Sequence, residues 1–136
     1  MQKRSGTSLN VYLIVKKKNS VLLSLRQNTG YCDGSYGLVS GHVEEGESAI
    51  NALIREAKEE AGIQIFASQI QLIHIMHRKT DRYNIDIFFT CSFPGAIVNL
   101  EPHKCANLAF FDLDSLPSNT IPYIEKALKA TLYKKI

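Results

Sequence analysis

The spacing of apolar residues along the chain predicts both strands and helices. Six segments gather β-branched and aromatic residues between turn-forming residues, a pattern typical of β-strands. These segments cover residues 8–15, 20–26, 36–40, 70–78, 83–93 and 107–111. Two further segments, 49–61 and 121–134, repeat apolar residues at the spacing of an amphipathic helix. Strands interleaved with only two helices predict an α/β fold, in which a mixed sheet lies between helical layers.

The first predicted helix has an apolar face and an acidic face. At about 100° per residue, Glu56, Glu59 and Glu60 share one narrow sector, and we expect Glu59 and Glu60 to point away from the core. The apolar stripe on the other side is formed by Ile50, Leu53, Ile54, Ala57 and Ala61. Like charges at this spacing destabilise a helix by about 0.2–0.5 kcal/mol per pair, which a bound divalent cation would offset. Carboxylates without cysteine or histidine favour Mg²⁺, with Mn²⁺ as a substitute, and Mg²⁺ is commonly held together with substrate phosphates. A solvated helix face is the alternative for any single glutamate.

One segment, residues 41–63, carries a motif around these glutamates. It reads GHVEEGESAINALIREAKEEAGI and resembles the Nudix box, G-x5-E-x7-R-E-U-x-E-E-x-G-U, in which U is an apolar residue. Every position of the pattern is filled. The matching residues are Gly41, Glu47, Arg55, Glu56, Ala57, Glu59, Glu60, Gly62 and Ile63. The order of predicted strands is also similar to that of the family, so the resemblance implies one Nudix domain over residues 1–136 with an α/β/α sandwich fold.

The resemblance implies a role for each acidic residue of the box. Glu59 and Glu60 match the main metal ligands, and Glu56 matches a third ligand or the base that activates water. The backbone carbonyl of Ser40, just before the box glycine, matches a further metal ligand. Glu101 resembles a glutamate that adds a metal contact or serves as the base, so Glu56 and Glu101 are rivals for that role.

The remaining two charged residues of the box suit a supporting role. A guanidinium can hold carboxylates in a two-pronged fork, so Arg55 would orient Glu47 and one of the ligand glutamates. Because a lysine ammonium cannot form this fork, Arg55→Lys is not expected to be conservative.

The reaction implied by the resemblance is magnesium-dependent attack of water on phosphorus in a nucleoside diphosphate linked to a group X. Compact members of the family imply a nucleoside or deoxynucleoside triphosphate, oxidised ones included, cleaved to monophosphate and pyrophosphate. Dinucleoside polyphosphates, nucleotide sugars and ADP-ribose are alternatives, because fold analogy does not fix the substrate. A nucleotide-binding module without hydrolysis is a second hypothesis, and a scaffold with a structural or solvated acidic helix is a third.

Residues other than the glutamates are candidate substrate contacts only because of their positions in the sequence. Arg26 ends a predicted strand before a turn-rich loop and would reach phosphate, although an exposed arginine without a substrate role fits equally well. His42 follows Gly41 and either touches phosphate or occupies the loop. Alternation along 83–93 places Asp86 and Phe88 on a face that could receive a nucleobase, while a half-exposed edge strand would show the same alternation.

Charge and composition limit the remaining options. The net charge is only +3, but six of the thirteen acids lie in residues 44–60, so the rest of the chain is basic and could attract a polyphosphate. The basic residues concerned are Lys16, Lys17, Lys18, Arg26, Arg78, Lys79, Arg82 and Lys104. The three consecutive lysines also fit an ordinary solubilising surface, because they precede a predicted hairpin turn. The three cysteines have no CxxC spacing, which predicts free thiols inside the cell. Without a leader or a long apolar run, a cytoplasmic protein without membrane or nucleic-acid polymer as partner is expected. A homodimer is left open.

Overall fold

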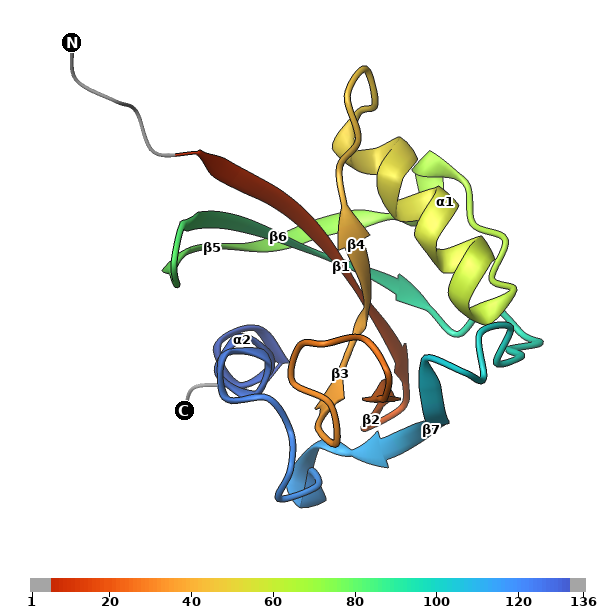
Figure 1. The fold of residues 1–136 in the computed structure, drawn as a ribbon. Helices are drawn as coiled ribbons and strands as arrows, with labels where there is room; N and C mark the ends of the chain where they lie inside the picture. The colour runs from red at the N-terminus through yellow and green to blue at the C-terminus, as the bar shows by residue number, and fades with distance from the viewer. Residues whose placement is uncertain (1–5, 133–136) are drawn as a thin grey trace, which may run out of the picture.

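The computed structural model describes residues 6–132, and Figure 1 shows its seven strands and two α-helices. The strands are β1 (Thr7–Lys17), β2 (Ser20–Arg26), β3 (Tyr36–Gly37), β4 (Val39–His42), β5 (Gln71–Lys79), β6 (Tyr83–Ser92) and β7 (Cys105–Asp112). The helices are α1 (Ala49–Ala61) and α2 (Pro122–Leu132), with short 3₁₀ turns at Ala67–Gln69 and Leu113–Ser115. The positions of the predicted strands and helices are confirmed, and the predicted helix residues 133–134 lie outside the described part of the chain.

The strands form one mixed sheet in the order β3-β2-β1-β6-β5. β1 and β6 run parallel, whereas the other pairs are antiparallel. One edge of β1 is shared: its last residues pair with β2, and its stretch from Asn10 to Leu13 pairs with β4. The predicted strand 36–40 is therefore two strands, because the chain leaves β2 at Leu38 and joins β1. This division places β4 beside helix α1.

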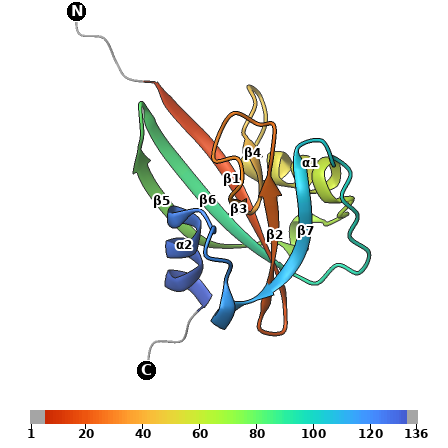
Figure 2. The ribbon, with the colours of Figure 1, turned by 60° about the horizontal axis from the view of Figure 1, so that its bottom comes forward.

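Alternation along β1 builds a separate core on each face of the sheet. Val11, Leu13 and Val15 pack on the side of α1, whereas Tyr12 and Ile14 pack on the side of α2. Figures 1 and 2 show the two helices on opposite sides of the sheet. The α/β/α sandwich predicted from the sequence is thus confirmed. Within residues 6–132, no helix is long and apolar enough to cross a lipid bilayer.

Local sequence signals set both ends of helix α1. Ser48 is the N-cap, and its hydroxyl accepts a hydrogen bond from the backbone N–H of Asn51 at 3.1 Å. Gly62 ends the helix with a left-handed φ of 64°, a conformation that glycine adopts at little cost. These caps set the first and last residues of α1 and thereby the position of its acidic residues.

Candidate active site

Helix α1 lies close to strand β4 at Gly41. A Cβ atom placed on Gly41 would lie 2.2 Å from the carboxyl carbon of Glu56 and 2.3 Å from its Oε1 atom. A side chain of any kind at position 41 would therefore displace that carboxylate. A glycine is favoured where the backbone adopts unusual dihedral angles or where another group approaches the backbone closely. Gly41 does not have a positive φ, so the close approach of Glu56 is the reason at this position.

Arg55 lies among the acidic side chains of the box and pairs with two of them closely. Its Nε and Nη2 atoms donate to the two carboxylate oxygens of Glu47 at 2.8 and 3.0 Å, and its Nη1 atom donates to Oε1 of Glu56 at 2.7 Å. Nη2 also donates to the backbone carbonyl of His42 at 3.2 Å. One guanidinium thus ties the helix to the loop before it and to the end of β4. The hydrogen bond from Arg55 lowers the pKa of Glu47 to about 2.

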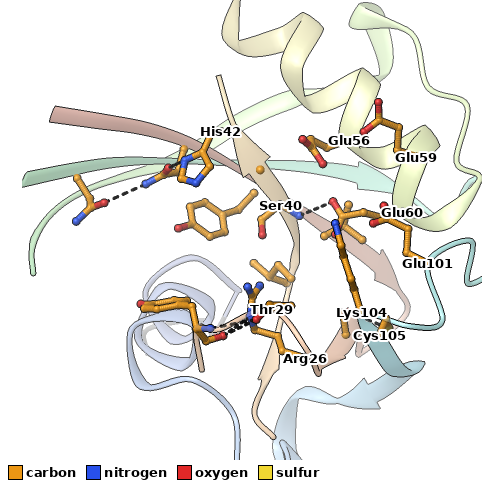
Figure 3. A pocket seen from close by; sticks show the side chains of 18 of the residues that line it. Arg26, Thr29, Ser40, His42, Glu56, Glu59, Glu60, Glu101, Lys104 and Cys105 are labelled. Atoms are coloured by element: carbon orange, nitrogen blue, oxygen red, sulfur yellow. Dashed lines mark hydrogen bonds between the residues drawn. The ribbon is translucent and has the colours of Figure 1, made fainter. Parts of the chain in front are cut away.

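Glu60 differs from Glu59 in its surroundings. The side chain of Glu59 is 54% exposed, whereas Glu60 is half-buried and its Oε2 atom accepts the backbone N–H of Ser40 at 3.2 Å. The expectation that both glutamates point away from the core is therefore wrong for Glu60, because α1 packs close enough to β4 to cover it. Burial, followed by repulsion from Glu56 and Glu101, raises the pKa of Glu60. Figure 3 shows Glu60 and Glu101 side by side, with Glu56 on the same side of the helix.

A divalent cation fits the chemistry of this cluster. Within residues 6–132, no three acidic, histidine or cysteine side chains already converge on one point in metal-binding geometry. Glu56, Glu60 and Glu101 nevertheless lie close enough to raise the pKa of Glu60, and all of their donor atoms are hard oxygens. Mutual repulsion of this kind is relieved when a cation enters, so the residues present suit Mg²⁺ or Mn²⁺ better than a softer metal.

The acidic cluster lines a cavity of about 820 Å³ that extends across the sheet. Most of the residues predicted to form the site reach this cavity: Arg26, Ser40, His42, Arg55, Glu56, Glu59, Glu60 and Glu101. Glu47 does not line it, but contacts Arg55, which does. The fold therefore brings most of the candidate residues to one place, although the role of each residue stays a prediction.

Arg26 contributes to the cavity while also holding the neighbouring loop. Its Nε atom donates to the backbone carbonyl of Tyr31 at 2.8 Å, and its guanidinium lies 5.6 Å from the centre of the Tyr31 ring. Asp33 braces the same loop by accepting hydrogen bonds from Thr29 and from the backbone N–H of Gly30. Figure 3 shows Arg26 and Lys104 extending into the cavity below the carboxylates. Cations thus face the acidic cluster.

His42 points toward the sheet rather than toward the glutamates. Its Nδ1 atom lies 2.7 Å from the side-chain oxygen of Asn10 and 3.2 Å from the hydroxyl of Ser8. The imidazole, which lines the cavity, is therefore engaged with β1, as Figure 3 shows.

Asp86 and Phe88 do not line the cavity, so neither is placed to touch a substrate directly. Both are fully buried, because β6 is an interior strand flanked by β1 and β5. Phe88 belongs to the core on the side of α2 and stacks on Tyr12, with ring centroids 4.6 Å apart. Direct contact of Asp86 or Phe88 with a nucleobase is therefore contradicted by their burial, and the alternative of a half-exposed edge strand is contradicted by the interior position of β6.

Asp86 instead supports a residue that does line the cavity. Its carboxylate pairs with Arg78, whose Nε atom donates to Oδ2 at 2.7 Å and whose Nη2 atom donates to Oδ1 at 3.2 Å. The side-chain amide of Asn10 and the hydroxyl of Tyr12 donate to Oδ1, each at 3.0 Å. Burial raises the pKa of Tyr12, which keeps its hydroxyl protonated as a donor. In the sequence, Arg78 stands out only as one of the basic residues that could attract a polyphosphate.

Other cavity residues come from elements that no sequence signal connects to the box. Tyr123 from helix α2 lines the cavity, and the guanidinium of Arg78 lies 3.9 Å from the centre of its ring. Tyr31 from the loop after β2 also lines it. Of the eight basic residues singled out by the uneven charge, Arg26, Arg78, Arg82 and Lys104 line the cavity, whereas Lys79 and the three consecutive lysines, Lys16, Lys17 and Lys18, do not. Charge asymmetry was the sequence signal for Arg78, Arg82 and Lys104, whereas Arg26 was also marked by its place before a turn-rich loop.

Comparisons with known proteins agree with this fold and site. The sequence profile of the NUDIX domain matches residues 6–132. An ADP-ribose pyrophosphatase of Methanocaldococcus jannaschii is 32% identical over 121 residues, which covers 85% of this chain and 68% of that protein. The NAD-capped RNA hydrolase NudC of Stutzerimonas stutzeri is 24% identical over 112 residues, which covers 82% of this chain but only 38% of that protein.

Solved structures share the same architecture. A MutT NUDIX hydrolase from Burkholderia pseudomallei superposes with a TM-score of 0.82 at 23% identity, covering 91% of this chain and 97% of that one. A MutT protein from Methanosarcina mazei also reaches 0.82, at 18% identity and 95% coverage of both chains. The chain belongs to the NUDIX family, whose members are hydrolases that act on pyrophosphate bonds and generally use divalent metal ions.

Proposed function

We propose that this protein hydrolyses the pyrophosphate bond of a nucleoside diphosphate linked to a group X, with Mg²⁺ as its physiological metal. The observation that carries the proposal is the meeting of Glu56, Glu60 and Glu101 at the acidic part of the cavity, with Arg26 and Lys104 facing them. Carboxylates alone would repel a polyphosphate. A divalent ion held by them would neutralise phosphate oxygens and lower the pKa of water at the site.

The chain's own residues would bind the substrate and move one proton. Arg26 would hold phosphate oxygens through its guanidinium, and Arg55 would keep Glu56 in place through their 2.7 Å contact. A carboxylate, Glu56 or Glu101, would take the proton of the attacking water. The water oxygen forms a bond to phosphorus, and the bond from phosphorus to the bridging oxygen breaks, which leaves two phosphorylated products and no covalent enzyme intermediate.

For the substrate, we propose ADP-ribose as the first compound to test within this class. The M. jannaschii relative, which this chain matches over most of its length, is named for that activity. The nucleoside and deoxynucleoside triphosphates implied by the resemblance to compact members of the family remain the second candidates, since a cavity of about 820 Å³ accommodates either kind of molecule. The RNA end cleaved by NudC is not carried over, because this chain matches only 38% of that protein.

The test is a hydrolysis panel with matched variants. Purified protein with Mg²⁺ is incubated with ADP-ribose, the four dNTPs, 8-oxo-dGTP and a dinucleoside polyphosphate, and products are separated by chromatography. Glu56→Gln and Glu60→Gln should each lower turnover by about 100-fold or more, since even residues that only orient a metal ligand are worth 10–100-fold. Both should fold, because glutamine has the shape of a glutamic acid. Glu45→Gln, in the exposed loop before the helix, is the control.

Two results would contradict the proposal. If the wild-type protein hydrolysed no compound of the panel but still bound nucleotides, the result would support the alternative of a binding module without hydrolysis. Turnover that survives in both Glu56→Gln and Glu60→Gln would place the chemistry elsewhere in the molecule.

A further inference from the structure

Arg78 has an unusual environment for a residue at the edge of a sheet. Its side chain is only 15% exposed, and it pairs with Asp86, whose side chain is 0% exposed. The four donors that reach this carboxylate come from Asn10, from Tyr12 and, twice, from Arg78. A buried ion pair is seldom more stable than apolar residues of similar size, because both charges must leave water. The ion pair of Arg78 and Asp86 therefore suggests a role other than stabilising the fold.

The hydrogen bonds to Asp86 occupy one edge of the guanidinium and leave another edge open. Nε and Nη2 face Asp86, whereas Nη1 donates to no acceptor within residues 6–132. One face of the guanidinium lies over Tyr123. Arg78 lines the cavity, and Nη1 together with the second hydrogen of Nη2 forms a second edge with two parallel donors that Asp86 does not use.

The register of the sheet relates this edge to the acidic cluster. Asp86 on β6 pairs with Asn10 on β1, and Asn10 pairs with His42 on β4. Strands are about 4.8 Å apart, so Asp86 lies about 10 Å across the sheet from the strand that borders the glutamates. A nucleotide whose diphosphate lies at the glutamates would extend its base along the cavity toward Arg78.

We propose that Arg78, held in place by Asp86, is the residue that selects the nucleobase, and that it selects a 6-oxopurine. The O6 and N7 atoms of guanine and hypoxanthine are adjacent acceptors that match two parallel donors, whereas adenine places an amino donor beside N7. Asp86 is a positioning residue that acts through Arg78. This inference rests on the proposed function for the placement of the diphosphate, and it ranks the guanine nucleotide of the panel, dGTP, ahead of ADP-ribose, whose base is adenine.

The experiment measures binding rather than turnover. GMP, IMP, 7-deaza-GMP and AMP hold no pyrophosphate bond, so their affinities can be measured by calorimetry with Mg²⁺ present. GMP and IMP should bind equally, because both carry O6 and N7. AMP should bind about 10-fold more weakly, since a two-pronged arginine contact discriminates between bases by roughly 5-fold to 150-fold. The 7-deaza-GMP, which lacks the N7 acceptor, should lie between them.

Variants assign this preference to named residues. Arg78→Lys keeps the charge without the paired donors and should bring the GMP to AMP affinity ratio close to one, with AMP affinity unchanged. Asp86→Asn should shift the same ratio in the same direction, a base-selective effect that a merely structural residue would not produce. Lys79→Gln, the next residue on β5, is exposed and outside the cavity and should retain the wild-type ratio. Should a single variant fail to fold, Arg78→Met with Asp86→Leu removes both charges together.

The outcomes separate this inference from the proposed function. Equal affinities for GMP and AMP in the wild-type protein would overturn the inference, as would a preference that persists in Arg78→Lys. A uniform loss for all four nucleotides in Arg78→Lys would also overturn it, because the contact would then lie on ribose or phosphate. Guanine preference without hydrolysis of any pyrophosphate would refute the proposed function alone.

Discussion

Substitution of Gly41 by alanine tests the arrangement of β4 and α1 directly. The new Cβ atom would lie 2.2 Å from the carboxyl carbon of Glu56, where 3.4 Å is an ordinary contact, so the carboxylate must move by about 1.2 Å. A misplacement of about 1 Å in a catalytic group can cost about 100-fold in rate. The displaced group is the far end of a flexible side chain, so stability should fall by less than about 1 kcal/mol, or about 4 °C in Tm.

The assay combines steady-state kinetics on the best substrate of the panel with thermal unfolding. We expect kcat to fall by about 100-fold in Gly41→Ala, with Tm little changed. Gly6→Ala is the matched control, since a Cβ at that position meets no atom within 4 Å. Wild-type kcat in Gly41→Ala would refute the reasoning, because Glu56 would then tolerate displacement. A large loss of Tm would show instead that the backbone, rather than the side chain, had moved.

Three further predictions concern the charged residues and the thiols. Arg55→Lys should lower kcat/KM by about 10–100-fold, because lysine cannot reach Glu47 and Glu56 with paired donors, and unchanged kinetics would contradict this role. The pKa of Glu47 is lowered to about 2 from its usual 4.5, so the stability that its pair with Arg55 contributes is fully present above pH 4.5 and is lost as pH falls toward 2. Urea unfolding at several pH values should show the wild-type advantage over Glu47→Gln shrinking across that range, and a constant difference would argue against the pair. Cys91 is buried with its pKa raised to about 11, and Cys105 is also buried, so a thiol reagent should modify only Cys32 in the folded protein and all three thiols after denaturation.

Much of the fold follows from local sequence signals. Alternation of apolar residues placed the strands to within a few residues, and Ser48 and Gly62 defined the ends of α1 through capping interactions that involve only near neighbours. The spacing of Glu56, Glu59 and Glu60 on one helix likewise requires no tertiary contact, since helical geometry alone brings them together. The sequence by itself thus determined the elements and the shared helix face of Glu56, Glu59 and Glu60, whereas Glu101 approaches Glu60 only in the folded chain.

Long-range pairing decided the rest of the site. The surroundings of Glu60 depend on a change of partner along the chain, because β3 pairs with β2 and β4 pairs with β1, and Leu38 between them does not signal this change. Asp86 joins Arg78 only because β5 and β6 pair in one register, and Tyr123 reaches Arg78 only because α2 packs on the same face. Periodicity shows which residues share a face of an element, but not which element covers that face. That choice depends on contacts between segments far apart in the chain, so the tertiary structure alone decided which side chains meet in the cavity.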